Sequence, residues 1–329
     1  MDPIERDYEQ LSAELIRAWR GPRTLAAFSR RLGSRSSSLV QNWEAKRRWP
    51  TAARALWCAE RAGVDVCEAL GKFYGRPPSW LGHVAPSTPQ GVVALLSDWL
   101  GSTSIQSIAE RTSRSRFAVS RWLSGKAEPR LPDFLRLIEA GSLRLADFVA
   151  ALAAPENIPS IAREWQTLQV ARSLAYEAPW SHAVLRALEL AQYQALPEHD
   201  DQFIARALGI SASQVRQCLQ LLMAAGQIEK RAARFAVTSA SHIDTRGDAA
   251  ANLRLKEWSA QVGMDRLRAG VEGQFSFNLF SVSETDLERL RELQLGYFRE
   301  LRRIVGSSSP NERVVLVNLQ LFDLGAPAR

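Results

Sequence analysis

The sequence predicts a mainly α-helical protein that opens with a tandem repeat of two five-helix units and ends in a small α/β unit. Three observations support this prediction. A frame of Trp, six residues and Pro occurs at residues 43–50 and again at 122–129. Apolar residues around each frame recur at helical spacing, with Gly or Ser breaks between the runs. Near the C-terminus, two segments alternate apolar and polar residues as strands do.

Each repeat unit is expected to contain five short helices. The first helices lie in "LSAELIRAWRG" and "GVVALLSDWLG", which are both amphipathic and end at Gly. The second and third helices of each unit are joined by tight turns, at Gly33-Ser34 and at Thr112-Ser113. A fourth helix opens at the Pro of each frame, and "VDVCEALGKF" and "LRLADFVAAL" supply the fifth. The register holds with one extra residue in the serine run of the first unit.

The domain boundaries follow changes in composition. The first unit is placed at residues 1–76 and the second at 91–154, with a linker at 77–90 because "GRPPSWLGHVAPSTPQG" is rich in Pro, Gly and Ser. "APENIP" then interrupts the helical pattern. A helical domain is placed at 155–245 and a C-terminal α/β domain at 246–329.

Composition narrows the class of protein. The chain has 329 residues, 46% hydrophobic and 23% charged, which is typical of several globular domains. No apolar run reaches the length of a membrane span, and the polar start "MDPIERDYEQ" does not resemble a secretory signal. Three Cys and four His without paired spacing predict no disulfide framework and no metal site. We therefore expect a cytoplasmic protein with no metal, no cofactor and no membrane partner.

The excess positive charge is confined to the repeat. Residues 1–154 contain 22 Lys and Arg and 15 Asp and Glu, and this difference accounts for the whole net charge of +7. Residues 155–329 are electrically balanced. A local basic excess favours encounter with polyanions and supplies phosphate contacts.

The repeat resembles the lambda-repressor-like (Cro and Xre type) DNA-binding domain. That family ends its third helix with an apolar residue and Glu, followed by a spacer with Gly and then a Pro. The first copy keeps Trp43-Glu44 and Pro50 but has no Gly in the spacer, and the second keeps Gly125 and Pro129 but has Leu123 in place of Glu. The resemblance covers about residues 8–154. It implies a helix-turn-helix in each unit, with Trp43 and Trp122 packed in the core.

The third helix of such a unit enters the major groove, and its first residues face the base edges. In the first unit the expected DNA contacts are Ser36, Ser37, Ser38 and Gln41, with Lys46, Arg47 and Arg48 on phosphates. In the second unit they are Ser115, Arg116, Ser120 and Arg121, with Lys126 and Arg130 on phosphates. A flexible serine loop is an alternative for the first set. Because Phe117 is large and apolar for a readout position, a protein-binding second copy is an alternative for the other set.

The stretch "DDQFIARALGISASQVRQCLQLLMAAGQIEKRAARFAVTS" follows a winged helix-turn-helix order: helix, turn at Gly209-Ile210-Ser211, longer helix, then two short β segments. Possible DNA contacts here are Ser213, Gln214, Arg216, Gln217, Lys230, Arg231 and Arg234. A structural or dimerising winged helix is an equal alternative, because this half has no net charge. His199, in "PEHDD", is interpreted as part of a solvated loop.

At the C-terminus, Phe275, Phe277 and Leu279 alternate as one strand and the run from Val315 to Leu321 as another. Between them, Ser283 and Asp286 start a long helix in the manner of a helix cap. The strand, helix and "VNLQLFDL" ending resembles a bacterial domain-of-unknown-function family of the Fibrobacter-paralogue type, with Asp323 where Pro is expected. This resemblance covers roughly residues 160–325 and implies regulator architecture. We expect the end of the chain to serve dimerisation or sensing.

Together these features predict a bacterial, sequence-specific transcription regulator that binds double-stranded DNA, is nucleoid-associated when bound and forms a homodimer. No phosphate loop or nucleophile motif occurs in the sequence, so we expect no enzymatic activity. An adaptor that binds proteins through its helical units, such as an antitoxin-like or phage-defence component, is the alternative from another class. A ligand-sensing domain, with a pocket between the winged helix and the terminal sheet and an unknown effector, is a third.

Overall fold

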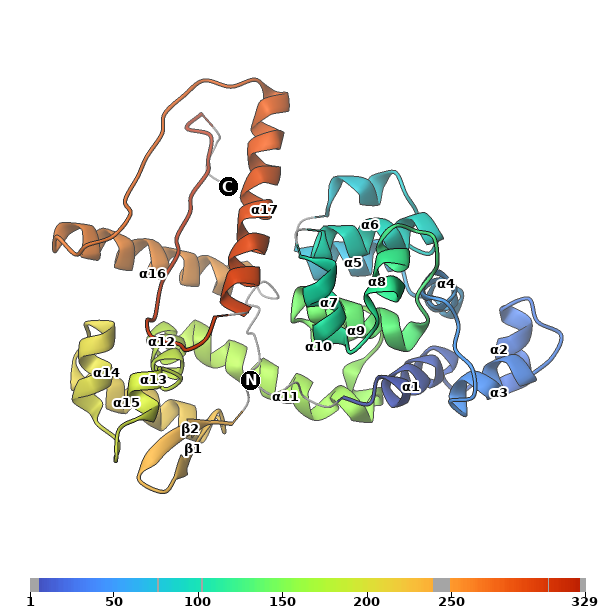
Figure 1. Cartoon of the computed structure of the whole chain (residues 1–329), viewed down its shortest axis with the longest axis horizontal. Coiled ribbons are helices and arrows are strands. Elements are labelled where there is room, and N and C mark those ends of the chain that lie inside the picture. Colours follow the sequence, from blue (N-terminus) through green and yellow to red (C-terminus); the bar gives the residue numbers. More distant parts are fainter. Residues whose placement is uncertain (1–5, 76, 102, 239–248, 307, 326–329) are drawn as a thin grey trace. The chain divides into compact units, whose positions relative to one another are not determined.

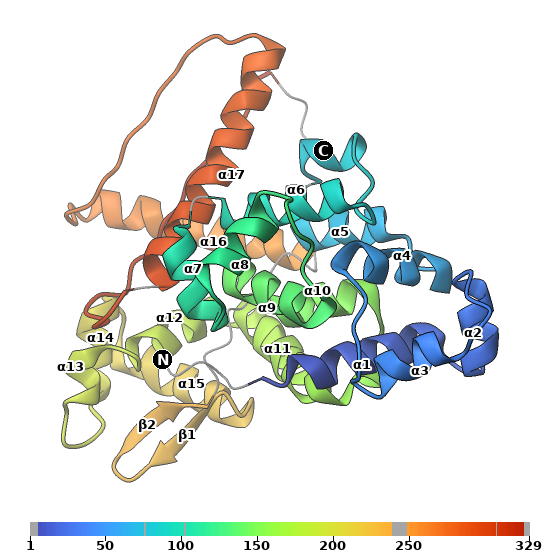
Figure 2. The same cartoon turned by 45° about the vertical axis from the view of Figure 1, so that its right-hand side comes forward.

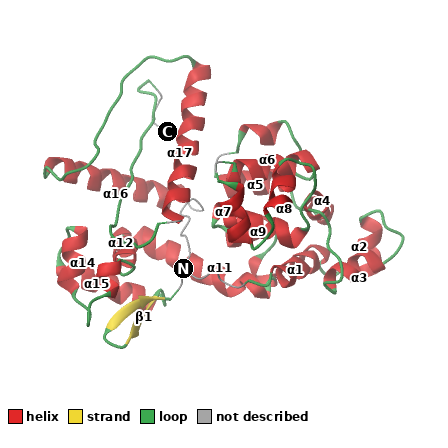
Figure 3. Cartoon of the chain, in the orientation of Figure 1, coloured by secondary structure: helices red, strands yellow, loops and turns green. Residues whose placement is uncertain are grey.

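The structure, a computed structural model, is mainly helical with one two-stranded sheet (Figures 1 and 3). It describes residues 6–75, 77–101, 103–238, 249–306 and 308–325. The chain divides into two compact units, Met1–Gln169 and Val170–Arg329. Among the described residues, no helix is both long enough and apolar enough to cross a membrane.

The first unit contains the two five-helix copies. The first copy comprises α1 (Tyr8–Arg20), α2 (Leu25–Arg31), α3 (Ser38–Glu44), α4 (Ala52–Ala62) and α5 (Val66–Tyr74). The second comprises α6 (Pro89–Leu100), α7 (Ile105–Thr112), α8 (Arg116–Leu123), α9 (Leu131–Ser142) and α10 (Leu145–Leu152). The predicted helix order of both copies is therefore confirmed. Figures 1 and 2 show from two directions that these helices form one body, with α2 and α3 at one end.

Buried residues occupy equivalent positions in the two copies. Trp19 and Trp99 lie 80 positions apart and are both buried, whereas Val40 and Val119 lie 79 positions apart and are fully buried. The register therefore changes by one residue between α2 and α3, in the serine run, as the sequence predicted. Hydroxyl caps are repeated as well: Thr24 accepts from Ala27 N at 3.2 Å and Ser104 from Ser107 N at 3.2 Å.

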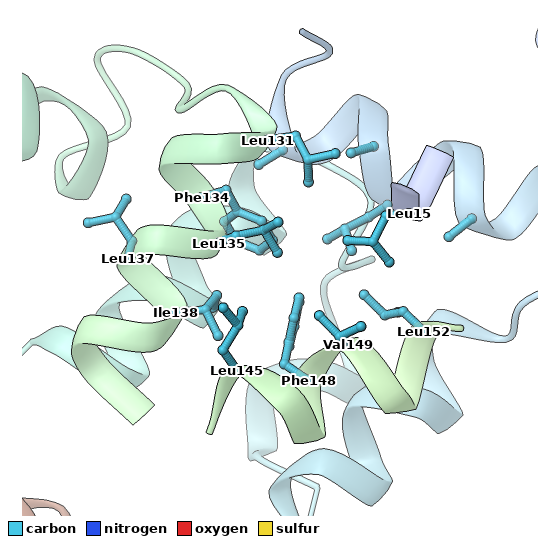
Figure 4. Packing of buried hydrophobic residues seen from close by; sticks show 14 of the residues in the cluster. Leu15, Leu131, Phe134, Leu135, Leu137, Ile138, Leu145, Phe148, Val149 and Leu152 are labelled. Atoms are coloured by element: carbon cyan, nitrogen blue, oxygen red, sulfur yellow. The ribbon is translucent and has the colours of Figure 1, made fainter. Parts of the chain in front are cut away.

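The two copies share a single hydrophobic core. Helix α1 packs on α9 of the other copy, α6 packs on α4, and α5 packs on α10. Figure 4 shows Leu15 of α1 facing the apolar side chains of α9 and α10, among them Phe134 and Phe148. Polar contacts cross between the copies too, because Trp19 Nε1 donates to Leu152 O at 3.0 Å and Ala53 N donates to Glu128 Oε1 at 2.6 Å.

An antiparallel bridge relates the copies by an approximate two-fold axis. Ala52 N donates to Pro129 O at 2.9 Å, and Leu131 N donates to Pro50 O at 3.0 Å. Pro50 corresponds to Pro129 and Ala52 to Leu131 in the repeat, so the two bonds exchange when the copies are exchanged. The packing of α1 on α9 and of α6 on α4 exchanges in the same way. The repeat is therefore folded as a dimer-like pair within one chain.

The stretch predicted as a linker, 77–90, is packed against this body. It forms a short 3-10 helix (Ser79–Gly82), and Trp80 Nε1 donates to Asp98 Oδ2 at 3.1 Å. A Cβ at Gly91 would lie 2.2 Å from Ala85 O, so only glycine allows this close approach. Because the copies share a core, the stretch joins two halves of one domain and does not act as a free tether.

Helix α11 (Pro159–Glu177) crosses from the first unit into the second. The second unit continues with α12 (Pro179–Ala187), α13 (Ala191–Gln194), α14 (Asp201–Leu208), α15 (Ala212–Ala224), β1 (Ile228–Arg231), β2 (Arg234–Val237), α16 (Ala249–Arg268) and α17 (Glu284–Gly306). Its core is formed by α11–α15 and β1. The strands pair antiparallel with Ile228 opposite Val237, and the two short β segments expected here are thereby confirmed.

The predicted β-α-β unit at the C-terminus is only partly correct. Helix α17 forms, and Ser283 Oγ accepts from Asp286 N at 3.1 Å as a helix cap. Residues 275–279 and 315–321 are not strands, because neither has a partner strand among the described residues. Alternation of apolar residues predicts an extended backbone, but a strand also needs a neighbour to bond with. Helix α16 was not predicted.

Candidate nucleic-acid interface

The first candidate surface lies at the start of α3. Gly33 has a φ of +69° and ends α2, and the serine run that follows is held by local hydrogen bonds. Ser34 Oγ donates to Ser36 O at 3.0 Å, and the Ser36 and Ser38 hydroxyls lie 2.7 Å apart. Ser36, Ser38 and Gln41 are exposed, whereas Ser37 is half-buried. The run is thus an ordered turn that presents short polar side chains.

Basic residues follow α3 directly. Lys46, Arg47 and Arg48 are all exposed. Lys46 Nζ lies 3.4 Å from Asp7 Oδ2, while no carboxylate of a described residue pairs with Arg47 or Arg48. The pKa of Asp7 is lowered chiefly because its carboxylate accepts from the backbone N–H of Gln10, and Lys46 adds to the effect. Arg47 and Arg48 are therefore the cations here that remain available for an anionic partner.

Arg20 and Glu44 hold α3 against α1. Arg20 Nε lies 2.6 Å from Glu44 Oε1, and Arg17 donates to Glu44 O at 2.8 Å. The equivalent positions of the second copy are Leu100 and Leu123, which belong to or pack on the apolar core. The second copy thus has Leu in place of both partners of the ion pair: Leu123 stands where the first copy has Glu44, and Leu100 stands where it has Arg20.

The second candidate surface lies at the start of α8. Ser115 Oγ accepts from Ala118 N at 3.2 Å and caps the helix, and Arg116 is exposed beside it. Phe117 is 72% exposed. Ser120 is half-buried, as is Arg121, which stacks on Phe117 with its guanidinium carbon 5.5 Å from the ring centroid. Arg116 is therefore the freest of the readout candidates in this copy.

The two basic candidates after α8 differ in their surroundings. Lys126 is exposed, and its carbonyl accepts from Arg121 Nη2 at 3.1 Å. Arg130 is exposed but belongs to the bridge between the copies, and its Nη1 donates to Trp49 O at 3.2 Å. Arg130 thus lies at the junction of the copies.

The winged-helix candidates are more strongly engaged within the protein. Gln214 forms a capping box with Ser211 at the start of α15. Arg216 Nη1 lies 3.1 Å from Asp201 Oδ2, and Arg231 Nε lies 2.6 Å from Glu229 Oε1. The remaining candidates are Ser213, Gln217 and Lys230, which are exposed, and Arg234, which is half-buried.

Sequence reasoning missed Arg35 and misjudged His199. Arg35 is exposed in the turn before α3, and no carboxylate of a described residue pairs with it. The helix-turn-helix pattern places cations on the third helix and just past it, whereas Arg35 precedes that helix. The solvated-loop interpretation of His199 was wrong. Its ring is half-buried, with Nδ1 3.1 Å from Tyr193 Oη and Nε2 2.8 Å from Asp201 Oδ1.

Tyr193 and His199 fix the hairpin to the helices. Phe235 N of β2 donates to Tyr193 Oη at 3.1 Å, and the His199 and Phe235 rings lie 4.8 Å apart. Burial raises the pKa of Tyr193, so its hydroxyl stays protonated. One signal in the sequence could have revealed this network: Tyr193, His199 and Asp201 all lie within the short stretch "QYQALPEHDD", and their side chains can bond to one another in series.

The comparison with known protein families gives a match in the second half of the chain. Residues 159–324 match the family described as Domain of unknown function (DUF4423), and the chain belongs to this family. The match supports the domain-of-unknown-function resemblance of the C-terminal half. No curated protein and no solved structure matches the chain.

Proposed function

We propose that this protein is a sequence-specific DNA-binding transcription regulator. Its α2–α3 and α7–α8 pairs would act as helix-turn-helix units of the lambda-repressor-like type. The observation that carries the proposal is that both copies present a capped or ordered polar helix start on the same rigid core. Duplex DNA itself has two-fold symmetry, so a pair of readers related by an approximate two-fold axis suits two half-sites.

Charge supports the same proposal. Exposed cations without a carboxylate partner among the described residues lie at the starts of α3 and α8 (Arg35 and Arg116) and just past their ends (Arg47, Arg48 and Lys126). Phosphate contacts position a protein on DNA, whereas contacts with base edges specify the sequence. In this proposal Gln41 and Arg116 contact bases, and Arg35, Arg47, Arg48 and Lys126 contact phosphates.

The first test is selection of the full chain against a random duplex library, followed by binding of the enriched duplex across a salt series. We expect two half-sites of different sequence, because α3 and α8 present different residues. Affinity should fall steeply with salt as counterions are released. No enrichment together with salt-independent binding would contradict the proposal.

Two variants separate base contacts from phosphate contacts. Arg116→Ala should cost about 1–3 kcal/mol on the selected site and relax one base position. Arg47→Ala with Arg48→Ala should weaken all duplexes alike and lower the salt slope by about 2. Arg163→Ala, which removes an exposed arginine of α11, is the matched control and should leave binding unchanged.

A protein-interaction adaptor is the second candidate function, and one observation favours it. Phe117 is 72% exposed at the start of α8, where it would suit an apolar partner better than a base edge. If α8 is a docking surface, Phe117→Ala should abolish partner binding while duplex binding, if any, remains with the first copy.

A further inference from the structure

Residues 249–325 carry many large apolar side chains but have no hydrophobic core of their own. Of the described residues in this range, only Ala251 is buried, and Val314 packs partly on the core of α11–α15. The side chains that remain at least two-thirds exposed are Phe277, Leu279, Leu293, Val315, Phe322 and Leu324. A folded domain does not leave such a set in water without a partner surface.

The exposed area is large enough for a stable interface. Phe275, Phe277, Phe280 and Phe322 are 46%, 92%, 56% and 68% exposed. At about 200 Å² for each ring, these four alone expose roughly 500 Å². The exposed leucines and valines bring the total toward the roughly 800 Å² that each partner buries in a standard interface.

The backbone on both sides of α17 has no strand partner among the described residues, although Gln294 Nε2 donates to Leu319 O at 3.3 Å. Among the described residues, no backbone–backbone hydrogen bond is formed by residues 272–282 or 312–322. Figures 1 and 3 show both segments as long loops. Their alternating apolar residues suit one buried sheet face, and unpaired extended segments are templates for pairing with another chain.

We propose that residues 271–324 form a dimerisation element that is completed by a second copy of this chain. In the dimer, the two extended segments become strands of a sheet shared by both copies, and the exposed apolar residues form its core. The partner copy supplies the same segments, so the surface is self-complementary, as a two-fold interface requires. This inference does not rest on DNA binding.

The charges of α17 favour a second copy over an unrelated partner. The first half of the helix carries four acidic and two basic residues (Glu284, Asp286, Glu288, Arg289, Arg291 and Glu292), and the second half carries three arginines and one glutamate (Arg299, Glu300, Arg302 and Arg303). When two copies of α17 pack antiparallel about a two-fold axis, the acidic half of each faces the basic half of the other.

The test is the mass of the full chain by sedimentation equilibrium from about 1 to 100 μM. We expect twice the chain mass of 36.6 kDa. Phe277→Glu and Val315→Glu each place a charge in the proposed core and should weaken self-association by at least 30-fold. Val170→Glu is the matched control, because Val170 is 46% exposed on α11 and lies outside the proposed element, and it should leave the mass unchanged. A monomer throughout, or a dimer that both variants leave intact, overturns the proposal.

Hydrogen exchange of the wild-type chain keeps the proposal testable if a variant misfolds. Amides of 272–282 and 312–322 should be protected at high concentration and lose protection on dilution, while α9 keeps its protection. Protection that does not depend on concentration would mean that the strands pair within one chain, and the proposal would be wrong.

Discussion

The two copies of the first unit build the same frame with different chemistry. In both copies a Trp of the first helix is buried, and a valine of the third helix is fully buried. Where the first copy fixes its third helix with the Arg20–Glu44 ion pair, the second uses Leu100 and Leu123. The comparison teaches that helix caps, turn geometry and the positions of apolar residues specify this frame, while the residues that close each helix contact can be exchanged in pairs.

Turn geometry makes the same point. After the third helix, Lys46 has a φ of +59° and the equivalent Gly125 a φ of +70°. After the second helix, Gly33 has a φ of +69° and the equivalent Ser113 a φ of +52°. The left-handed conformation is therefore required at both places in both copies, and each copy uses glycine at only one of them.

The largest effect is expected from a substitution in the core that the copies share. Phe134 of α9 is fully buried between the copies, so Phe134→Ala should destabilise the unit by about 3–5 kcal/mol. Hydrogen exchange should then report lower protection in α1 and α4 as well as in α6 and α9. Loss confined to α6–α10 would show that the copies unfold independently.

The next largest effect is expected when the Arg20–Glu44 ion pair of the first copy is replaced by the leucine pair found in the second copy. Glu44→Leu leaves Arg20 with only backbone acceptors and should cost about 2 kcal/mol in urea denaturation. Adding Arg20→Leu reproduces the pair found in the second copy and should recover at least half of that loss. Equal stability of the single and double variants would show that the two positions are not coupled.

A smaller effect is expected at the left-handed residue. Lys46→Gly should stabilise the first copy by about 1 kcal/mol, because glycine adopts this conformation without strain. The loss of the exposed contact with Asp7 offsets this gain only slightly. Gly125→Lys should destabilise the second copy by at least as much, since its Cβ would lie 3.3 Å from Val93 Cγ2. Thermal unfolding of both variants measures whether each one gains or loses stability relative to the wild-type chain.

The smallest effect is expected in how the stability of each copy depends on pH, because the first helices of the two copies have different caps. Asp7 caps α1 with a lowered pKa, whereas α6 is capped by the uncharged Thr88. A carboxylate whose pKa is lowered on folding contributes stability above its unfolded pKa, and that stability is lost as the pH falls through the folded value. Asp7→Thr should therefore remove about 0.5 kcal/mol near pH 7 and nothing at pH 2. Urea denaturation at both pH values checks this.

The helices of both copies could be predicted from the sequence because their signals are local. Apolar spacing, hydroxyl caps at Thr24 and Ser104 and the Pro two residues before each fourth helix all act within a few residues. The association of the copies could not be predicted. Apolar spacing shows that a face is buried but does not identify its partner, so nothing in the spacing of Leu15 indicates that it faces α9.

In the candidate site, too, local features could be predicted from the sequence and long-range contacts could not. The exposure of Ser36, Gln41 and Arg116 could be predicted from the outward face of each third helix. The position of Arg130 could not, because it depends on a bridge formed with residues 79 positions earlier. The terminal strands failed for a related reason: Phe277 and Val315 alternate correctly, but their pairing depends on a neighbour outside the local sequence.

The bridge between residues 50–52 and 129–131 also has a genetic consequence. In a protein made of two identical chains, every codon change appears on both sides of the symmetry axis. Here each side is encoded once, so one change alters one side and leaves the other as it was. The two sides differ in this way, since Arg20 and Glu44 on one side correspond to Leu100 and Leu123 on the other. The two outward faces of this pair can therefore differ in sequence while the contact that holds the copies together is kept.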